Sequence, residues 1–145
     1  MRLTLALVSP LFMLLCAAPT EAQSAPGPCT ESAVKQGNLR SADDAFSYMP
    51  PYGKPVIGKP AIQDANQKNF SARTNVKRSW VGEHRIVATP AGDMAYEYGT
   101  MHIGYDEAGK HNEFEAVMLT VYKANGGACQ VVALTMQPLE EQPGR

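Results

Sequence analysis

The stretch that decides the fold reads ADDAFSYMPPYG and spans residues 42–53. Two carboxylates precede a short apolar run at 45–49, which ends at a Pro-Pro-x-Gly turn. Ser41 is a favourable helix N-cap, and carboxylates are stabilised near the exposed N–H groups of a first helical turn. The pattern therefore predicts a helical turn that holds Asp43 and Asp44, followed by a first strand.

The segments that follow predict one helix and a meander of strands. The apolar pair at 56–57 is a short partner for the first strand, and Pro60 favours the first turn of a helix over 61–72. Apolar and polar residues then alternate with period two over 77–88, 94–105, 113–123 and 129–136. The turns between these segments are short, which favours antiparallel neighbours, and mid-strand glycines at 82 and 99 predict bulges that bend the sheet. The sequence therefore predicts an α+β fold with one curved antiparallel sheet wrapped on helices.

The N-terminus has the pattern of a secretory signal. A short positive start precedes an apolar run at 3–18, and Thr20-Glu21-Ala22 offers a small-x-small cleavage site. We therefore expect a signal peptide at 1–22 and a periplasmic or secreted protein, with no membrane association after cleavage. An alternative, a lipoprotein with its lipid on Cys16, conflicts with Leu15, because a small residue is expected before the lipidated cysteine.

The remaining chain is long enough for one domain. We expect a linker with a short N-terminal helix at 23–38, the domain itself at 39–137 and a polar tail at 138–145. The formal net charge is -1 and both signs are spread along the chain, so no basic stripe is present that could neutralise a phosphate backbone. Nucleic acid is therefore an unexpected partner.

Two cysteines, Cys29 and Cys129, remain after removal of the signal. An even number of cysteines in an oxidising compartment suggests a disulfide, which would tie the N-terminus to the last strand. Two unpaired thiols are the alternative, because sequence does not show whether the two Cα atoms approach closely enough.

Five short motifs in this order resemble the SnoaL-like, ketosteroid-isomerase-like and nuclear transport factor 2-like superfamily, and are most similar to the domain of unknown function family 4440. The matching residues are Asp43-Asp44-Ala45, Gly58 to Ile62, Gly92 to Gly99, Leu119 to Lys123, and Gly126-Gly127. The resemblance covers residues 39–136 and implies a cone-shaped α+β barrel. It also implies that the first helix of the family is shortened here, because few residues lie between Cys29 and Ser41.

The sequence departs from the family where function is concerned. Ketosteroid isomerases carry an aspartate base just before the proline that ends the first strand, and Met49 stands there in this chain. The tryptophan usual after the Gly-Gly turn is replaced by Ala128-Cys129, and Leu134-Thr135-Met136 replace a polar residue near the end of the last strand. Isomerisation by that aspartate is therefore not expected.

Candidate site residues come from the strands. Two histidines, His84 and His102, lie on strand faces that hold aromatic residues, so one of them is expected to line the cavity. For acid–base catalysis, His102 is the candidate base, with Tyr48 or Tyr98 as hydrogen-bond donor. The candidate ligand-binding residues are apolar or aromatic and would line a flexible pocket: Met49, Tyr52, Trp80, Tyr96 and Met118. No His-x-His or Cys-x-x-Cys spacing is present, and no metal or other cofactor is expected.

Two functions remain open from sequence. The leading hypothesis is an exported domain that binds a small apolar or aromatic ligand without catalysis. The alternative is an isomerase, dehydratase or cyclase that acts on a carbonyl-containing small molecule by acid–base catalysis. In either case the resemblance implies a homodimer that pairs through the outer face of the sheet.

Overall fold

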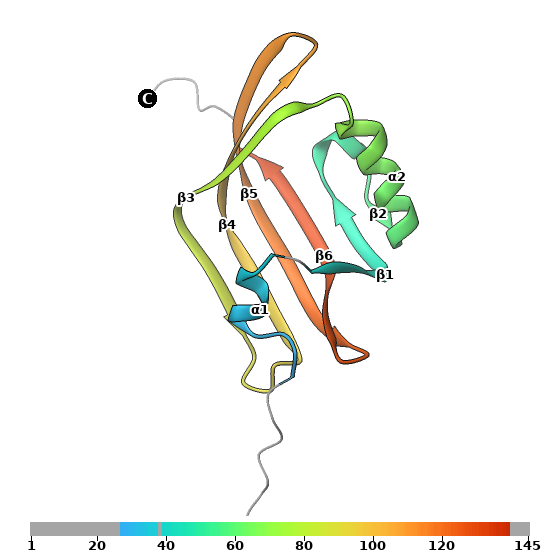
Figure 1. The fold of residues 1–145 in the computed structure, drawn as a ribbon, viewed down its shortest axis with the longest axis vertical. Coiled ribbons are helices and arrows are strands. Elements are labelled where there is room, and N and C mark those ends of the chain that lie inside the picture. The colour runs from blue at the N-terminus through green and yellow to red at the C-terminus, as the bar shows by residue number, and fades with distance from the viewer. Residues whose placement is uncertain (1–26, 38, 140–145) are drawn as a thin grey trace, which may run out of the picture.

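The structure is a computed structural model that describes residues 27–37 and 39–139 (Figure 1). The expected signal peptide and most of the C-terminal tail lie outside these residues. The elements in chain order are α1 (Glu31–Lys35), β1 (Arg40–Tyr48), the 3-10 helix η1 (Pro50–Tyr52), β2 (Val56–Ile57), α2 (Lys59–Phe70), β3 (Thr74–Ala88), β4 (Met94–Glu107), β5 (Lys110–Asn125) and β6 (Ala128–Pro138). The class is α+β, as predicted from sequence. No helix in the described part is long and apolar enough to cross a membrane.

All six strands form one curved sheet in the order β2-β1-β6-β5-β4-β3. The pairs from β3 to β6 are antiparallel, as their tight turns predict, and β1 pairs with β2 antiparallel. The pairing of β1 with β6 is parallel, so the expectation of an entirely antiparallel sheet is corrected. The reason is topological: α2 and the meander separate β1 from β6, and only closely connected strands are held antiparallel by their turns. The sheet is mixed and open.

The acidic stretch that opens the domain is strand and not helix. Asp43 and Asp44 lie within β1, and both are exposed. The register between β1 and β6 shifts between Ser41 and Phe46. Such an irregularity lets two consecutive residues face water, which a regular strand with period two does not allow. The predicted helical turn is therefore wrong, because sheet pairing overrides the local capping signal.

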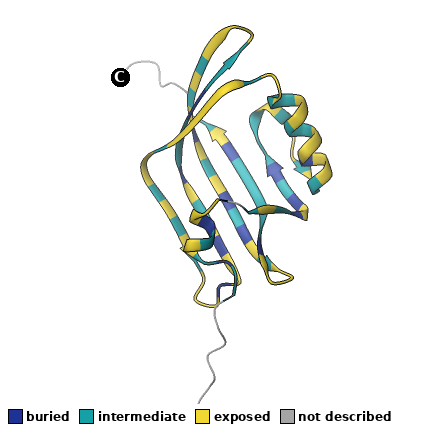
Figure 2. Cartoon of the chain, in the orientation of Figure 1, coloured by how far each residue is buried: buried dark blue, intermediate teal, exposed yellow. Residues whose placement is uncertain are grey.

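The two helices cover the inner face of the sheet at separate places (Figure 1). Ile62 of α2 packs against Ala42 and Ala45 of β1. The short α1 begins at Thr30, whose hydroxyl accepts a hydrogen bond from the Ala33 backbone N–H. With five residues, α1 is the shortened first helix that the resemblance implies. Strand β3 has no buried residue, whereas β1, β4, β5 and β6 all have buried positions (Figure 2).

A disulfide fastens α1 to the sheet. Cys29, just before α1, is bonded to Cys129 at the start of β6, across a separation of 100 residues. The Cys29 backbone N–H also donates to the Gly92 carbonyl, in the turn before β4. The segment before α1 is thereby attached to two ends of the meander, and α1 is held against the inner face.

Candidate functional site

Two adjoining cavities, both open to solvent, lie on the inner face of the sheet. The first, which we call the histidine compartment, has a volume of about 430 Å³ and lies under α1. The second, which we call the arginine compartment, has a volume of about 530 Å³ and lies beside the end of α2. Met101, Met118 and Leu134 line both compartments, so the two meet at these side chains.

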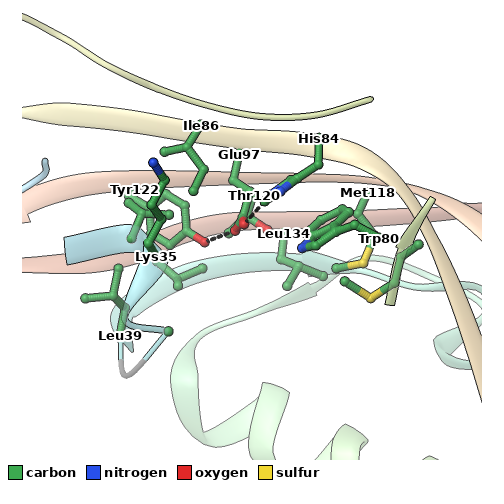
Figure 3. A pocket seen from close by; sticks show the side chains of 14 residues that line it. Lys35, Leu39, Trp80, His84, Ile86, Glu97, Met118, Thr120, Tyr122 and Leu134 are labelled. Atoms are coloured by element: carbon green, nitrogen blue, oxygen red, sulfur yellow. Dashed lines mark hydrogen bonds and ion pairs between the residues drawn. The ribbon is translucent and has the colours of Figure 1, made fainter. Parts of the chain in front are cut away.

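A chain of three polar side chains crosses the histidine compartment. The Nε2 atom of His84 lies 2.8 Å from Oε1 of Glu97, and the Tyr122 hydroxyl donates to Oε2 of Glu97 at 2.6 Å (Figure 3). The three residues come from β3, β4 and β5, which are neighbours in the sheet. Both oxygens of the carboxylate therefore have a partner.

The only tryptophan of the chain packs against the face of the His84 ring. Trp80 stacks on His84 with 3.9 Å between ring centroids and 10° between planes. Gly82 and Glu83 of β3 have no partner in β4, because they lie between the pairs Val81–Thr100 and His84–Gly99. An insertion of two residues preserves the alternation of sides, so Trp80 and His84 both lie on the inner face. The glycine is needed here, because a Cβ on Gly99 would stand 3.2 Å from the Trp80 ring and 3.0 Å from the Glu83 carbonyl oxygen.

This geometry fixes which groups can exchange protons. Burial and the hydrogen bond to Glu97 raise the pKa of the Tyr122 hydroxyl above its usual value, so Tyr122 serves as a donor and not as a base. If the Nε2–H of His84 donates to Glu97, its Nδ1 is the acceptor. Among the described residues, Nδ1 of His84 makes no hydrogen bond. A histidine oriented by a carboxylate is a common arrangement for a general base.

The arginine compartment is mainly apolar. Met49, just before η1, and Met136 of β6 line it, and Phe70, Tyr105 and Phe114 add aromatic rings. Its charged and amide groups are Arg73, Arg78 and Asn66, and Tyr105 adds a hydroxyl.

Three of the residues predicted to bind ligand do line the cavities. Trp80 belongs to the histidine compartment, Met49 to the arginine compartment, and Met118 to both. Tyr52 lines neither, but its hydroxyl donates to Oδ1 of Asn66 at 2.6 Å and so orients a residue that does. Burial raises the pKa of Tyr52.

The other predicted residues are on the wrong side of the sheet or outside the cavities. Tyr96, Tyr98 and His102 share one face of β4, whereas Glu97 and Met101 on the opposite face line the histidine compartment. Tyr96 and Tyr98 stack on one another, with exposures of 43% and 36%. Nε2 of His102 lies 3.6 Å from an exposed carboxylate, Glu113. Tyr48 ends β1 and lines neither compartment.

The structure therefore does not bring the three candidate catalytic residues together at either compartment. Alternation identified correctly that His102 shares a face with the two tyrosines, but it does not tell which face is covered. The hydrogen-bonded polar group inside the histidine compartment is His84, Glu97 and Tyr122. A signal for it existed in the sequence, since Gly99 and Glu97 have the same parity, and a mid-strand glycine marks a close approach on its face.

The described part of the chain holds no cluster of three or more histidine, cysteine or carboxylate side chains that could bind a metal. His84 and Glu97 form a pair only.

No protein-family model matches the chain, and no curated protein matches it. Solved structures do match. A calcium/calmodulin-dependent protein kinase II association domain from Xanthomonas campestris has a TM-score of 0.61 at 14% identity, over 70% of this chain and 71% of the other. A nuclear transport factor 2-like protein from Salmonella enterica serovar Typhimurium has a TM-score of 0.59 at 10% identity, over 74% and 77%.

An enzyme is also among the similar structures. The hexachlorocyclohexane dehydrochlorinase LinA-type3 from Novosphingobium barchaimii has a TM-score of 0.56 at 14% identity, over 73% of this chain and 76% of the other. At such identities the similarity concerns the fold alone. The fold is that of nuclear transport factor 2-like proteins, a class that includes enzymes and association domains.

Proposed function

We propose that this protein is an exported domain that binds a small apolar or aromatic molecule in its two-compartment cavity. The observation that carries the proposal is the lining: methionines and aromatic rings from several elements surround a few oriented polar groups. Ligand sites of small molecules have this composition, and methionine adapts its shape to different ligands. The finer assignment to family 4440 is part of the proposal and rests on the five sequence motifs.

Trp80 provides a direct test, because it is the only tryptophan and lines the histidine compartment. A screen of small aromatic compounds should identify ligands that raise the melting temperature and change the Trp80 emission. A ligand at 100 times its dissociation constant adds about 2.7 kcal/mol to the free energy of unfolding. Binding that is unaffected by Met118→Glu, which places a charge between the compartments, would contradict a cavity site.

A second candidate function is favoured by the His84–Glu97 pair. In this alternative, Nδ1 of His84 accepts a proton next to a carbonyl group, and the Glu97 carboxylate stabilises the resulting imidazolium. This replaces His102 as the base. The measurement is deuterium incorporation from D₂O into a panel of enolisable carbonyl compounds, followed by NMR. His84→Gln should abolish exchange and His102→Gln should not; exchange that survives His84→Gln would exclude this mechanism.

Export is proposed from the signal sequence and is consistent with the disulfide between Cys29 and Cys129, since such bonds persist in oxidising compartments. We expect the mature chain to begin near Gln23. Mass spectrometry of the protein from a periplasmic or secreted fraction tests this expectation, and a soluble form that keeps Met1 would contradict it.

We further propose that a second copy of the chain covers the outer face of the sheet. The exposed apolar side chains of this face lie on adjacent strands and form one patch: Val81, Val87, Tyr96, Tyr98, Val117 and Leu119. Patches of this kind mark interaction sites, and a homodimer buries the same patch twice. The patch is flanked by charges of both signs, Arg85 and Glu115. Two copies related by a two-fold axis therefore do not repel each other through charges of a single sign. Light scattering should show that Leu119→Lys is monomeric and that Gln67→Lys, on the exposed side of α2, remains dimeric; a monomeric parent protein would refute the proposal.

A further inference from the structure

Arg73 has an unsatisfied buried donor. It lies between α2 and β3, and its side chain is 15% exposed. Its guanidinium stacks between two rings, 4.7 Å from the centroid of Phe70 and 4.0 Å from that of Tyr105. Its Nε atom is buried and has no hydrogen-bond partner among the described residues. The nearest carboxylate oxygen, on Glu107, lies 3.7 Å from Nε, which is close enough for an ion pair but too long for a hydrogen bond.

The surrounding compartment offers only donors among its charged and amide groups. Arg78 is a second cation, and it pairs in register with Ile103, which faces the same cavity. The oxygen of Asn66 accepts from the Tyr52 hydroxyl, and the Asn66 amide N–H₂ has no hydrogen-bond partner among the described residues. No carboxylate lines the arginine compartment. A buried N–H donor without an acceptor is costly, so the geometry calls for an acceptor of negative charge inside the compartment.

We propose that the arginine compartment binds the carboxylate of a small organic acid. This deepens the proposed function and rests on it: the apolar body of the same molecule lies against Met101 and Met118 and extends toward Trp80. A carboxylate suits the planar guanidinium of Arg73, which can donate two parallel hydrogen bonds to it. Free phosphate, a hydrophilic dianion, fits this compartment poorly, because most of the lining is apolar and offers it no hydrogen bonds. Aromatic acids and short fatty acids share the required chemistry.

The experiment compares acids with neutral molecules of the same shape. Phenylacetate and octanoate are titrated calorimetrically into the full mature protein, alongside phenylacetamide and octanamide. Each acid should bind at least tenfold more tightly than its amide. Whichever acid binds more tightly identifies the aromatic or the aliphatic source.

Matched variants locate the site. Arg73→Met keeps a side chain between Phe70 and Tyr105 and should weaken acid binding at least tenfold, while amide binding is unchanged. Arg85→Met is the control, because Arg85 is 60% exposed and pairs with Glu83 outside both compartments. It should leave both affinities unchanged, and circular dichroism should show that both variants fold.

The outcomes separate this inference from the proposed function. Equal binding of acid and amide, or acid binding that survives Arg73→Met, overturns the carboxylate site and leaves the apolar ligand site standing. Failure of both acids to bind, while neutral aromatics still change the Trp80 emission, has the same meaning. Failure of every probe to bind contradicts both.

Discussion

The two compartments of the cavity hold polar groups in opposite states. In the histidine compartment, both oxygens of Glu97 are occupied, one by His84 and one by Tyr122. In the arginine compartment, the buried Nε of Arg73 has no hydrogen-bond partner among the described residues. A satisfied network stabilises the fold whether or not a ligand is present, whereas an unsatisfied buried donor costs stability that a ligand can recover. Substitutions in the two compartments should therefore act in opposite ways on stability.

The largest expected effect concerns the disulfide that holds α1 over the histidine compartment. Replacing both Cys29 and Cys129 by serine should lower the free energy of unfolding by about 3–5 kcal/mol, because the bond closes a long loop. Since Val34 and Lys35 of α1 line only this compartment, the variant should alter the Trp80 emission and leave acid binding at Arg73 intact. Urea denaturation measures the first effect and fluorescence the second. Equal stability of the oxidised parent and the variant would show that the bond does not constrain the fold.

A smaller effect is expected from removing the carboxylate at the centre of the network. Glu97→Leu leaves Nε2 of His84 and the Tyr122 hydroxyl without their partner, which should cost about 2–4 kcal/mol. Glu83→Leu is the control on the same sheet, because Glu83 is 65% exposed and should change stability by no more than about 0.5 kcal/mol. Arg73→Met, by contrast, should leave stability unchanged or raise it. If Glu97→Leu and Arg73→Met lower the free energy of unfolding equally, the two compartments do not differ in how their polar groups affect stability.

The smallest effect is a dependence on alkaline pH. The folded-state pKa of Tyr122 is raised above the value of 10.0 that applies when the chain is unfolded. The unfolded chain therefore loses this proton first, so the contribution of Tyr122 is fully present below a pH of about 10 and declines above it. Tyr122→Phe should show a shallower loss of stability between about pH 10 and 11 than the parent.

The control for this effect is Tyr48→Phe, since Tyr48 lies at the end of β1, lines neither compartment and is outside the proposed dimer patch. In this variant the free energy of unfolding, measured by urea denaturation at each pH, should fall with pH as steeply as in the parent protein. If the free energy of unfolding falls equally steeply with pH in Tyr122→Phe and in the parent, the Tyr122 hydroxyl is not held by Glu97.

Much of the fold could be predicted because local rules fix it. Alternation and turns placed the four long strands, and their antiparallel pairing follows from short connections such as Asn125-Gly126-Gly127. The glycine at 82 predicted the irregularity that the structure has between Val81 and His84. The acidic stretch was misassigned as a helical turn because pairing with β6 is a contact distant in sequence, which no local signal reveals.

The sequence by itself determined which residues share a face: His102 with Tyr96 and Tyr98 on one side of β4, Glu97 with Gly99 on the other. Only the tertiary structure decided which of the two faces is covered by the helices, because a period of two is symmetric between them. It also decided that His84 meets Glu97 and that Arg73 lies between two rings, since each contact joins elements whose relative placement depends on sheet curvature and helix packing. The side chains on which the proposed binding site depends are therefore the ones that strand alternation alone could not select.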